Sequence, residues 1–124
     1  MPQARQGNAV AELDIGLMHF SGHGLPKDYS EAARWFAASA LQGQIGAQIN
    51  LGVLYATGDG LPQDHIRAYV WFNVAASRNN SSAAKYRDHI ASEITPDQLR
   101  AAQALADKCK ASNYSDCGGT ASTR

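Results

Sequence analysis

The sequence predicts an all-α protein, an α/α solenoid of antiparallel helix pairs, and two observations carry this prediction. The stretch SGHGLPKDYSEAARWF begins at Ser21 and returns as TGDGLPQDHIRAYVWF at Thr57, which is 36 residues later. Self-similarity at a fixed period of about 20–50 residues is typical of solenoids and other repeat arrays. Alanine is also the commonest residue of the chain, and it favours helices and their close packing.

Composition narrows the class of protein further. A chain of 124 residues, 44% of them hydrophobic, fits one folded domain or a short repeat array. Its 11 basic and 11 acidic residues are scattered, whereas a nucleic-acid partner would require a stripe of basic residues against the phosphates. No apolar run approaches the length of about 20 residues that a membrane-spanning helix needs. We therefore expect neither nucleic-acid binding nor membrane insertion.

The first helix of each repeat is predicted at residues 8–20 and 44–56, where small and apolar residues recur with helical spacing. Gly16 and Gly52 occupy equivalent positions inside these helices. A glycine at such a position costs up to about 1 kcal/mol relative to alanine. We expect each glycine to mark a point where a neighbouring helix packs closely.

The loop after the first helix, GHGLPKD and later GDGLPQD, has a structural reason for each residue. The glycines end a helix and allow positive φ, and the proline prevents the helix from continuing. Asp28 and Asp64 are each placed to cap the second helix, and Glu31 completes a capping box where Arg67 stands in the second copy. Because the loop follows a helix and the next helix begins with a carboxylate, we do not expect it to bind phosphate.

The second helices carry an aromatic pair at the same place in each repeat, first Trp35 and Phe36, then Trp71 and Phe72. Small residues follow both pairs, so the aromatic side chains are predicted to pack in the core between helices. An aromatic recognition stripe on the surface is the alternative.

No third GLP loop follows, and the remaining residues predict two further helices, SSAAKYRDHIASEI and TPDQLRAAQALADKCKAS. The second has Thr95 as its cap, Pro96 at its first position and Gln98 to close a capping box. Because the terminal units of solenoids are atypical, we interpret the two helices as a degenerate capping hairpin. The predicted segments are a leader or appended tail at 1–6, repeats at 7–42 and 43–79, the capping pair at 80–112, and a flexible tail with Cys117 at 113–124.

The chain follows the pattern GxxxAxxxLGxxYxxGxGLPxDxxxAxxWFxxAAxxG, which resembles the Sel1-like repeat, a relative of the tetratricopeptide repeat. The resemblance implies an α/α solenoid that acts as an adaptor for a protein or peptide partner, without catalysis and without a cofactor. The first copy departs from the pattern modestly, at Ile15, His19 and Ser39. The residues that carry the resemblance are Gly43, Ala47, Leu51, Gly52, Tyr55, Gly58, Gly60, Asp64, Ala68, Trp71, Phe72, Ala75 and Ala76.

Surface-facing positions of the first helices are the predicted contacts with a partner. The resemblance implies that these helices line a concave face, where equivalent side chains of successive repeats would touch one extended partner. A solvated polar face is the alternative for any one of them. The positions form three equivalent pairs: Asn8 and Gln44, Glu12 and Gln48, and His19 and Tyr55.

Catalytic motifs are incomplete. Ser82 and Lys85 match the S-x-x-K element of penicillin-recognising serine enzymes, but the chain lacks the S-D-N and K-T-G elements that those enzymes also need. Ser81 or Ser82 is better explained as a helix cap. We expect no catalysis and no metal, with a β-lactam-reactive or other hydrolytic enzyme and a self-assembling spacer as the alternatives. The histidines His19, His23, His65 and His89 form no metal or hydrolytic motif.

The cysteines, Cys109 and Cys117, lie eight residues apart near the C-terminal end. A disulfide between them would close a short loop and hold an end that would otherwise fray. Disulfides persist in oxidising compartments, so this pairing indicates a bacterial periplasmic or secreted protein. Two reduced thiols in a cytoplasmic protein are the alternative.

Overall fold

A computed structural model describes residues 2–117 of the chain, and the side chains from residue 8 onward. This part of the chain is all-α and contains no strand, as predicted. None of its helices combines the length and the apolar character that crossing a membrane requires. The helices are α1 (Pro2–Ser21), α2 (Tyr29–Leu41), α3 (Ile45–Thr57), α4 (His65–Ala76), α5 (Ser81–Ala91) and α6 (Pro96–Ala111).

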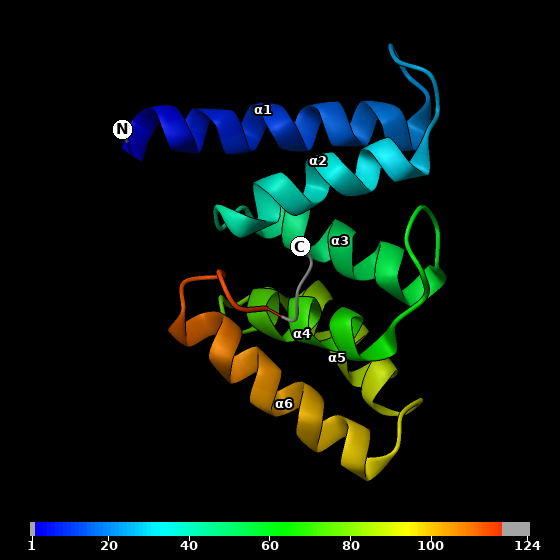
Figure 1. The fold of residues 1–124 in the computed structure, drawn as a ribbon, viewed down its shortest axis with the longest axis vertical. Coiled ribbons are helices and arrows are strands. Elements are labelled where there is room, and N and C mark those ends of the chain that lie inside the picture. Colours follow the sequence, from blue (N-terminus) through cyan, green and yellow to red (C-terminus); the bar gives the residue numbers. More distant parts are fainter. Residues whose placement is uncertain (1, 118–124) are drawn as a thin grey trace.

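The helices form an α/α solenoid in which successive helices from α1 to α5 pack against one another, while α6 packs against α4. Figure 1 shows them stacked in sequence order, from α1 at one end of the molecule to α6 at the other. The pairs α1–α2 and α3–α4 are the two repeats, and α2 joins them by packing against α3. α1 begins at Pro2, so residues 2–6, expected as a leader, are helical.

The two glycines inside the first helices sit where a phenylalanine of the second helix packs. A Cβ atom placed on Gly16 would lie 2.7 Å from the ring of Phe36, and one on Gly52 would lie 2.6 Å from the ring of Phe72. The predicted close approach is therefore confirmed in both repeats. It brings Phe36 and Phe72 into the core with Trp71, while Trp35, also predicted there, is only half-buried.

The same backbone hydrogen bond closes the GLP loop in both repeats, by joining the end of the loop to the first helix. The backbone N–H of Asp28 donates to the carbonyl of His19 over 2.9 Å, and that of Asp64 donates to the carbonyl of Tyr55 over 2.8 Å. Each aspartate also caps its helix by accepting from the backbone three residues later. The predicted capping box at Glu31 is only half formed. Its carboxylate accepts a hydrogen bond from Arg34 and not from the backbone N–H of Asp28, because that N–H already donates to the carbonyl of His19.

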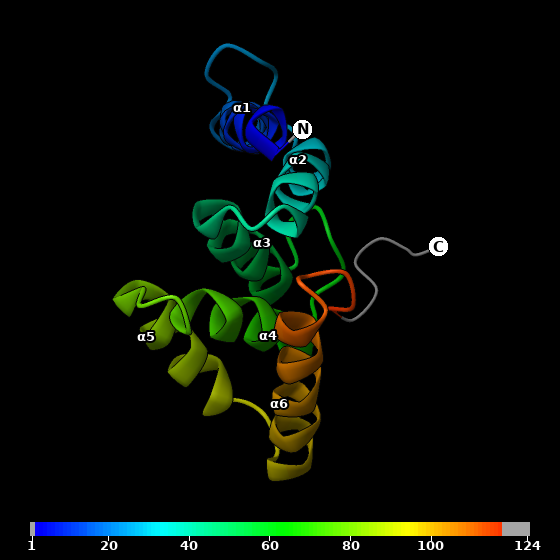
Figure 2. The same ribbon diagram turned by 90° about the vertical axis from the view of Figure 1, so that its left-hand side faces the viewer.

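The C-terminal helix pair is present, and both of its members pack against α4. Figure 2 shows α5 and α6 diverging along different sides of α4. Thr95 and Gln98 form the predicted capping box of α6. The cap of α5 is Asn80, whose side chain accepts from the N–H of Ala83 over 2.9 Å, so the assignment of this role to Ser81 or Ser82 was wrong.

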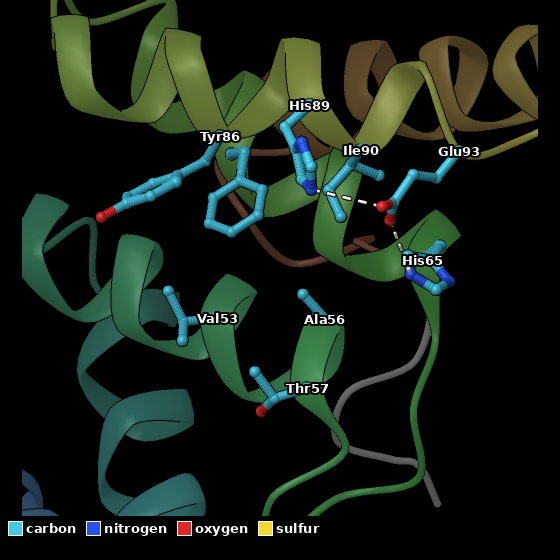
Figure 3. Close-up of a pocket in the computed structure, with 9 residues that line it drawn as sticks. Val53, Ala56, Thr57, His65, Tyr86, His89, Ile90 and Glu93 are labelled. Atoms are coloured by element: carbon cyan, nitrogen blue, oxygen red, sulfur yellow. Dashed lines mark ion pairs between the residues drawn. The ribbon is translucent and has the colours of Figure 1, made fainter.

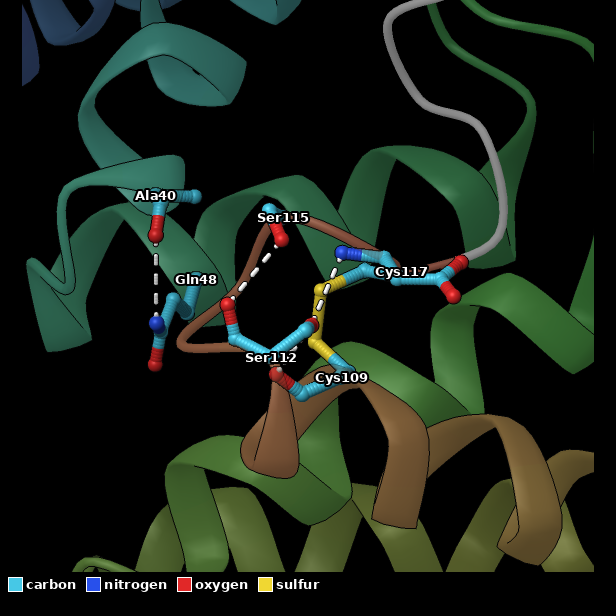
Figure 4. The surroundings of a disulfide bond; sticks show 7 residues. Ala40, Gln48, Cys109, Ser112, Ser115 and Cys117 are labelled. Atoms are coloured by element: carbon cyan, nitrogen blue, oxygen red, sulfur yellow. Dashed lines mark hydrogen bonds between the residues drawn. A yellow bond between two sulfur atoms is a disulfide. The ribbon is translucent and has the colours of Figure 1, made fainter.

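The segment after α6 is held against the core. Cys109 and Cys117 form a disulfide, and both are almost completely buried (Figure 4). The N–H of Tyr114 donates to the carbonyl of Cys109 over 2.8 Å, and the Tyr114 ring lies over Gly43. The expectation of a loose tail is therefore wrong for residues 113–117, because disulfide and ring contacts hold them; residues 118–124 lie outside the described part.

Candidate functional site

The first-helix positions predicted to meet a partner divide into exposed and internally bonded residues. Asn8 is exposed on α1. Glu12 accepts a hydrogen bond of 2.6 Å from Gln42, the residue that caps the end of α2, and this bond ties the two helices of the first repeat together. His19 places its Nδ1 atom 3.0 Å from the carbonyl oxygen of Pro26, inside the loop. Gln44 caps α3 by accepting from the N–H of Gly46 over 2.8 Å.

Gln48 and Tyr55 are not surface residues, and the expectation that they are exposed was wrong. Gln48 has an exposed fraction of 0%, and its amide donates to the carbonyl of Ala40 over 3.2 Å (Figure 4). Tyr55 is 7% exposed. Both lie on the side of α3 that packs into the core, so neither can reach a partner in this conformation. Partner contact at Asn8, Glu12, His19 and Gln44 stays a prediction.

Burial of the Tyr55 side chain has a consequence for stability at high pH. Desolvation raises the pKa of its hydroxyl above the ordinary value of about 10; the nearby Arg67 lowers it and Asp64 raises it by smaller amounts. The unfolded chain therefore ionises Tyr55 at a lower pH than the folded protein does. Its contribution to stability is complete below the ordinary pKa and is lost as the pH rises through the raised one.

We expect urea unfolding to show a free energy of unfolding that falls as the pH is raised from about 8 to about 11. In Tyr55→Phe part of this fall should disappear, because a buried ring without a hydroxyl cannot ionise. Tyr86→Phe is the matched control, since Tyr86 is 45% exposed. Identical pH profiles for the wild type and Tyr55→Phe would contradict the assignment.

An open pocket lies where the first helix of the second repeat faces α5. Its volume is about 290 Å³, close to the lower end of the range for small-ligand sites, about 300–1,000 Å³. Figure 3 shows Val53 and Ala56 of α3 on one wall and Tyr86 and Ile90 of α5 on the other. The residues that line it are Val53, Ala56, Thr57, His65, Phe72, Tyr86, His89, Ile90 and Glu93.

The pocket is mainly apolar and aromatic in its interior. Phe72 and Ile90 are 2% and 3% exposed, so they are part of the protein core that the pocket reaches. The ring of Tyr86 lies 5.2 Å from the ring of Phe72, measured between centroids, and tilts by 37°. Tyr86 is among the more exposed large apolar side chains of the described residues. Tyrosine is one of the residue types that are enriched among the hot spots of protein–protein interfaces.

One edge of the pocket carries its polar groups. The carboxylate of Glu93 lies 3.4 Å from Nε2 of His65 through one oxygen and 3.2 Å from Nε2 of His89 through the other (Figure 3). These contacts tie the start of α4 to the end of α5. Within residues 2–117 no cluster of side chains has the arrangement that would hold a metal ion, so we interpret these groups as a polar rim.

The pocket was not predicted from the sequence, because the predicted partner contacts are all positions that the two repeats share. The pocket instead depends on a position at which they differ, since Ala56 of the second repeat stands where the first has Phe20. The histidines and the glutamate of the rim come from separate elements, and their meeting depends on how α5 packs against α4.

The fold is a stack of helix pairs, and an open apolar pocket lies between α3 and α5. These features define a repeat scaffold of the α/α solenoid class. The profile of the Sel1 repeat matches residues 9–44 and 45–80. The chain therefore belongs to the Sel1 repeat family, whose members are typically protein-interaction scaffolds.

Two solved structures are similar to this chain. One is a protective antigen present in uropathogenic Escherichia coli strains that displays an SLR fold, with a TM-score of 0.80 and 26% identity over 94% of this chain and 26% of that one. The other is a Sel1 repeat protein from Oxalobacter formigenes, with a TM-score of 0.64 and 31% identity over 65% of this chain and 61% of that one. This chain thus spans about a quarter of the antigen's length. No curated protein gives a significant match.

Proposed function

We propose that the protein is a non-catalytic scaffold that binds a protein or peptide segment along the face formed by α1, α3 and α5. The observation that carries this proposal is the open pocket between α3 and α5, with a buried aromatic floor and a polar rim. Preformed sites of this kind bind without an ordering cost in the scaffold. The disulfide, typical of oxidising compartments, supports a bacterial periplasmic or secreted location for this function.

The hydrolytic alternative gains no support from the arrangement of its residues. Ser82 and Lys85 are both exposed near the start of α5, and neither lines the pocket. A serine nucleophile needs a base within hydrogen-bond reach and a site that holds the reacting carbonyl. The other alternative, a self-assembling spacer, is tested by light scattering together with the peptide experiment.

The proposal predicts that a charge placed in the pocket weakens the binding of peptides. Peptides selected from a random display library against the full chain are measured by fluorescence anisotropy with the wild type and with Val53→Arg. Val53 lines the pocket and is half-buried, so the arginine would fill the space with a charged group; we expect affinity to fall about tenfold or more. Ala101→Arg, on the exposed side of α6, is the matched control and should leave affinity unchanged.

Circular dichroism should show the same helix content for all three proteins. Selected peptides that bind Val53→Arg as tightly as the wild type would show that the pocket is not the binding site. A chain that selects no peptide, and whose light scattering shows concentration-dependent association, would replace the proposal by the spacer.

A further inference from the structure

The first repeat contains an aromatic ring at the position that is open in the second. A shift of 36 residues places Phe20 on Ala56 and Phe36 on Phe72. The ring of Phe20 lies against that of Phe36, with 6.3 Å between centroids, and against that of Tyr29, with 5.3 Å. At the end of α3 the small side chain of Ala56 leaves the corresponding space beside Phe72 unfilled, and the pocket lies there.

The walls of the pocket suit a further ring. Phe72 lies on the inner side, and Tyr86 is on the α5 side at 5.2 Å from it. Aromatic pairs are favourable at centroid separations of about 4.5–7 Å in tilted or offset arrangements. The phenyl group of Phe20 meets Phe36, the counterpart of Phe72, within that range, so the first repeat shows that a phenyl ring can pack at this position. Its other neighbour, Tyr29, has His65 of the pocket rim as its counterpart.

The rim adds a preference in charge. Among the residues that line the pocket, Glu93 is the one carboxylate, and none is a lysine or an arginine. Its two oxygens lie 3.4 Å from Nε2 of His65 and 3.2 Å from Nε2 of His89. A basic side chain next to the bound ring would add a charge-assisted contact with this carboxylate, while an acidic one would be repelled.

We propose that this pocket binds the side chain of a partner's phenylalanine that is adjacent to a basic residue, so that the ring occupies in the second repeat the place that Phe20 occupies in the first. The inference rests on the proposed function and names its partner: a peptide segment containing Phe-Lys or Phe-Arg. The specificity arises at Ala56, where the two repeats differ, and the basic neighbour pairs with Glu93.

The probe is a capped Gly-Gly-Phe-Lys-Gly-Gly peptide added to isotope-labelled full chain and followed by NMR. We expect saturable shifts of the backbone amides of Ala56, Tyr86 and Ile90, which line the pocket. The same peptide with alanine for phenylalanine should produce none of them, because the ring supplies most of the buried contact. The version with glutamate for lysine should bind about threefold more weakly or worse.

Two variants test the position itself. Ala56→Phe supplies the ring from the chain's own side chain and should lower the affinity for the probe about tenfold while leaving the helix content unchanged. Ala101→Phe, on the exposed side of α6, is the matched control and should bind like the wild type. Should Ala56→Phe fail to fold, Tyr86→Ala tests the same site by removing an exposed wall, with the same expected loss.

The two proposals can fail separately. If library peptides bind in a Val53→Arg-sensitive manner but the probe produces no shifts and Ala56→Phe binds them as the wild type does, the aromatic pocket is overturned and the scaffold function stands. If no peptide of either kind binds, both fail. Shifts caused equally by the phenylalanine and alanine probes would also overturn the aromatic pocket.

Discussion

Replacing Gly60 by alanine is expected to lower the free energy of unfolding by about 3 kcal/mol. Gly60 has a φ of +75°, and a left-handed backbone costs an L-residue about 1–2 kcal/mol. A Cβ at this position would also lie 2.8 Å from the backbone nitrogen of Ser30 and closer still to the carbonyl group of Tyr29. Because these atoms belong to the backbone of α2, they cannot move aside as a side chain would, and overpacking of this kind costs about 1–3 kcal/mol.

The first repeat offers a matched control in Gly24→Ala. Gly24 has a similar φ of +85°, but the atom nearest to a new Cβ is the terminal methyl of Met18, at the end of a flexible side chain. We expect it to lose only about 1 kcal/mol, mainly the backbone cost. Urea denaturation followed by circular dichroism measures both. Equal losses in the two variants would show that the contact between the second loop and α2 does not constrain Gly60.

Removal of the disulfide is expected to cost about 2.5 kcal/mol of stability. The bond joins residues that are eight apart in sequence, and closing a loop of that length restricts the unfolded chain by about that amount. Without it the segment that carries Tyr114 would be held only by side-chain packing and a few hydrogen bonds. The change is large against a total stability that is about 5–15 kcal/mol for typical domains.

The double variant Cys109→Ala and Cys117→Ala tests this, with urea denaturation as the measurement. The wild type in excess dithiothreitol should approach the midpoint of the variant, and the variant itself should not respond to the reductant. A midpoint that is the same for the oxidised wild type and the variant would mean that the disulfide contributes nothing to stability.

The sequence was sufficient to predict those features that depend on interactions between residues close together in the chain or on the repeat. The repeat places each helix, and the glycine–proline–aspartate loop both ends one helix and caps the next, as Asp28 and Asp64 do. The glycines inside α1 and α3 indicated a close approach of helices, which Phe36 and Phe72 make. These signals survive in the structure because each acts over a few residues or is repeated at a fixed period.

The exposure of the predicted partner contacts depended on interactions between helices, which no local sequence pattern contains. Gln48 is polar and stands on a first helix, yet it is buried because the carbonyl of Ala40 accepts from its amide. Glu12 and Gln44 are used in contacts within the scaffold. Polar residues on a helix predict a solvated face on average, and whether a given one lies inside is decided by the partner that a neighbouring helix offers.

The sequence by itself therefore determined the fold class, the repeats, the helices and the caps of α2, α4 and α6, since backbone conformation and helical periodicity are encoded locally. The tertiary structure decided three further matters: the disulfide between Cys109 and Cys117, the packing of both α5 and α6 on α4, and the open pocket beside Ala56. The physical reason is that burial is a property of the assembled helices. A small residue leaves a pocket only where the facing side chains do not close over it, and that depends on how α5 sits on the second repeat.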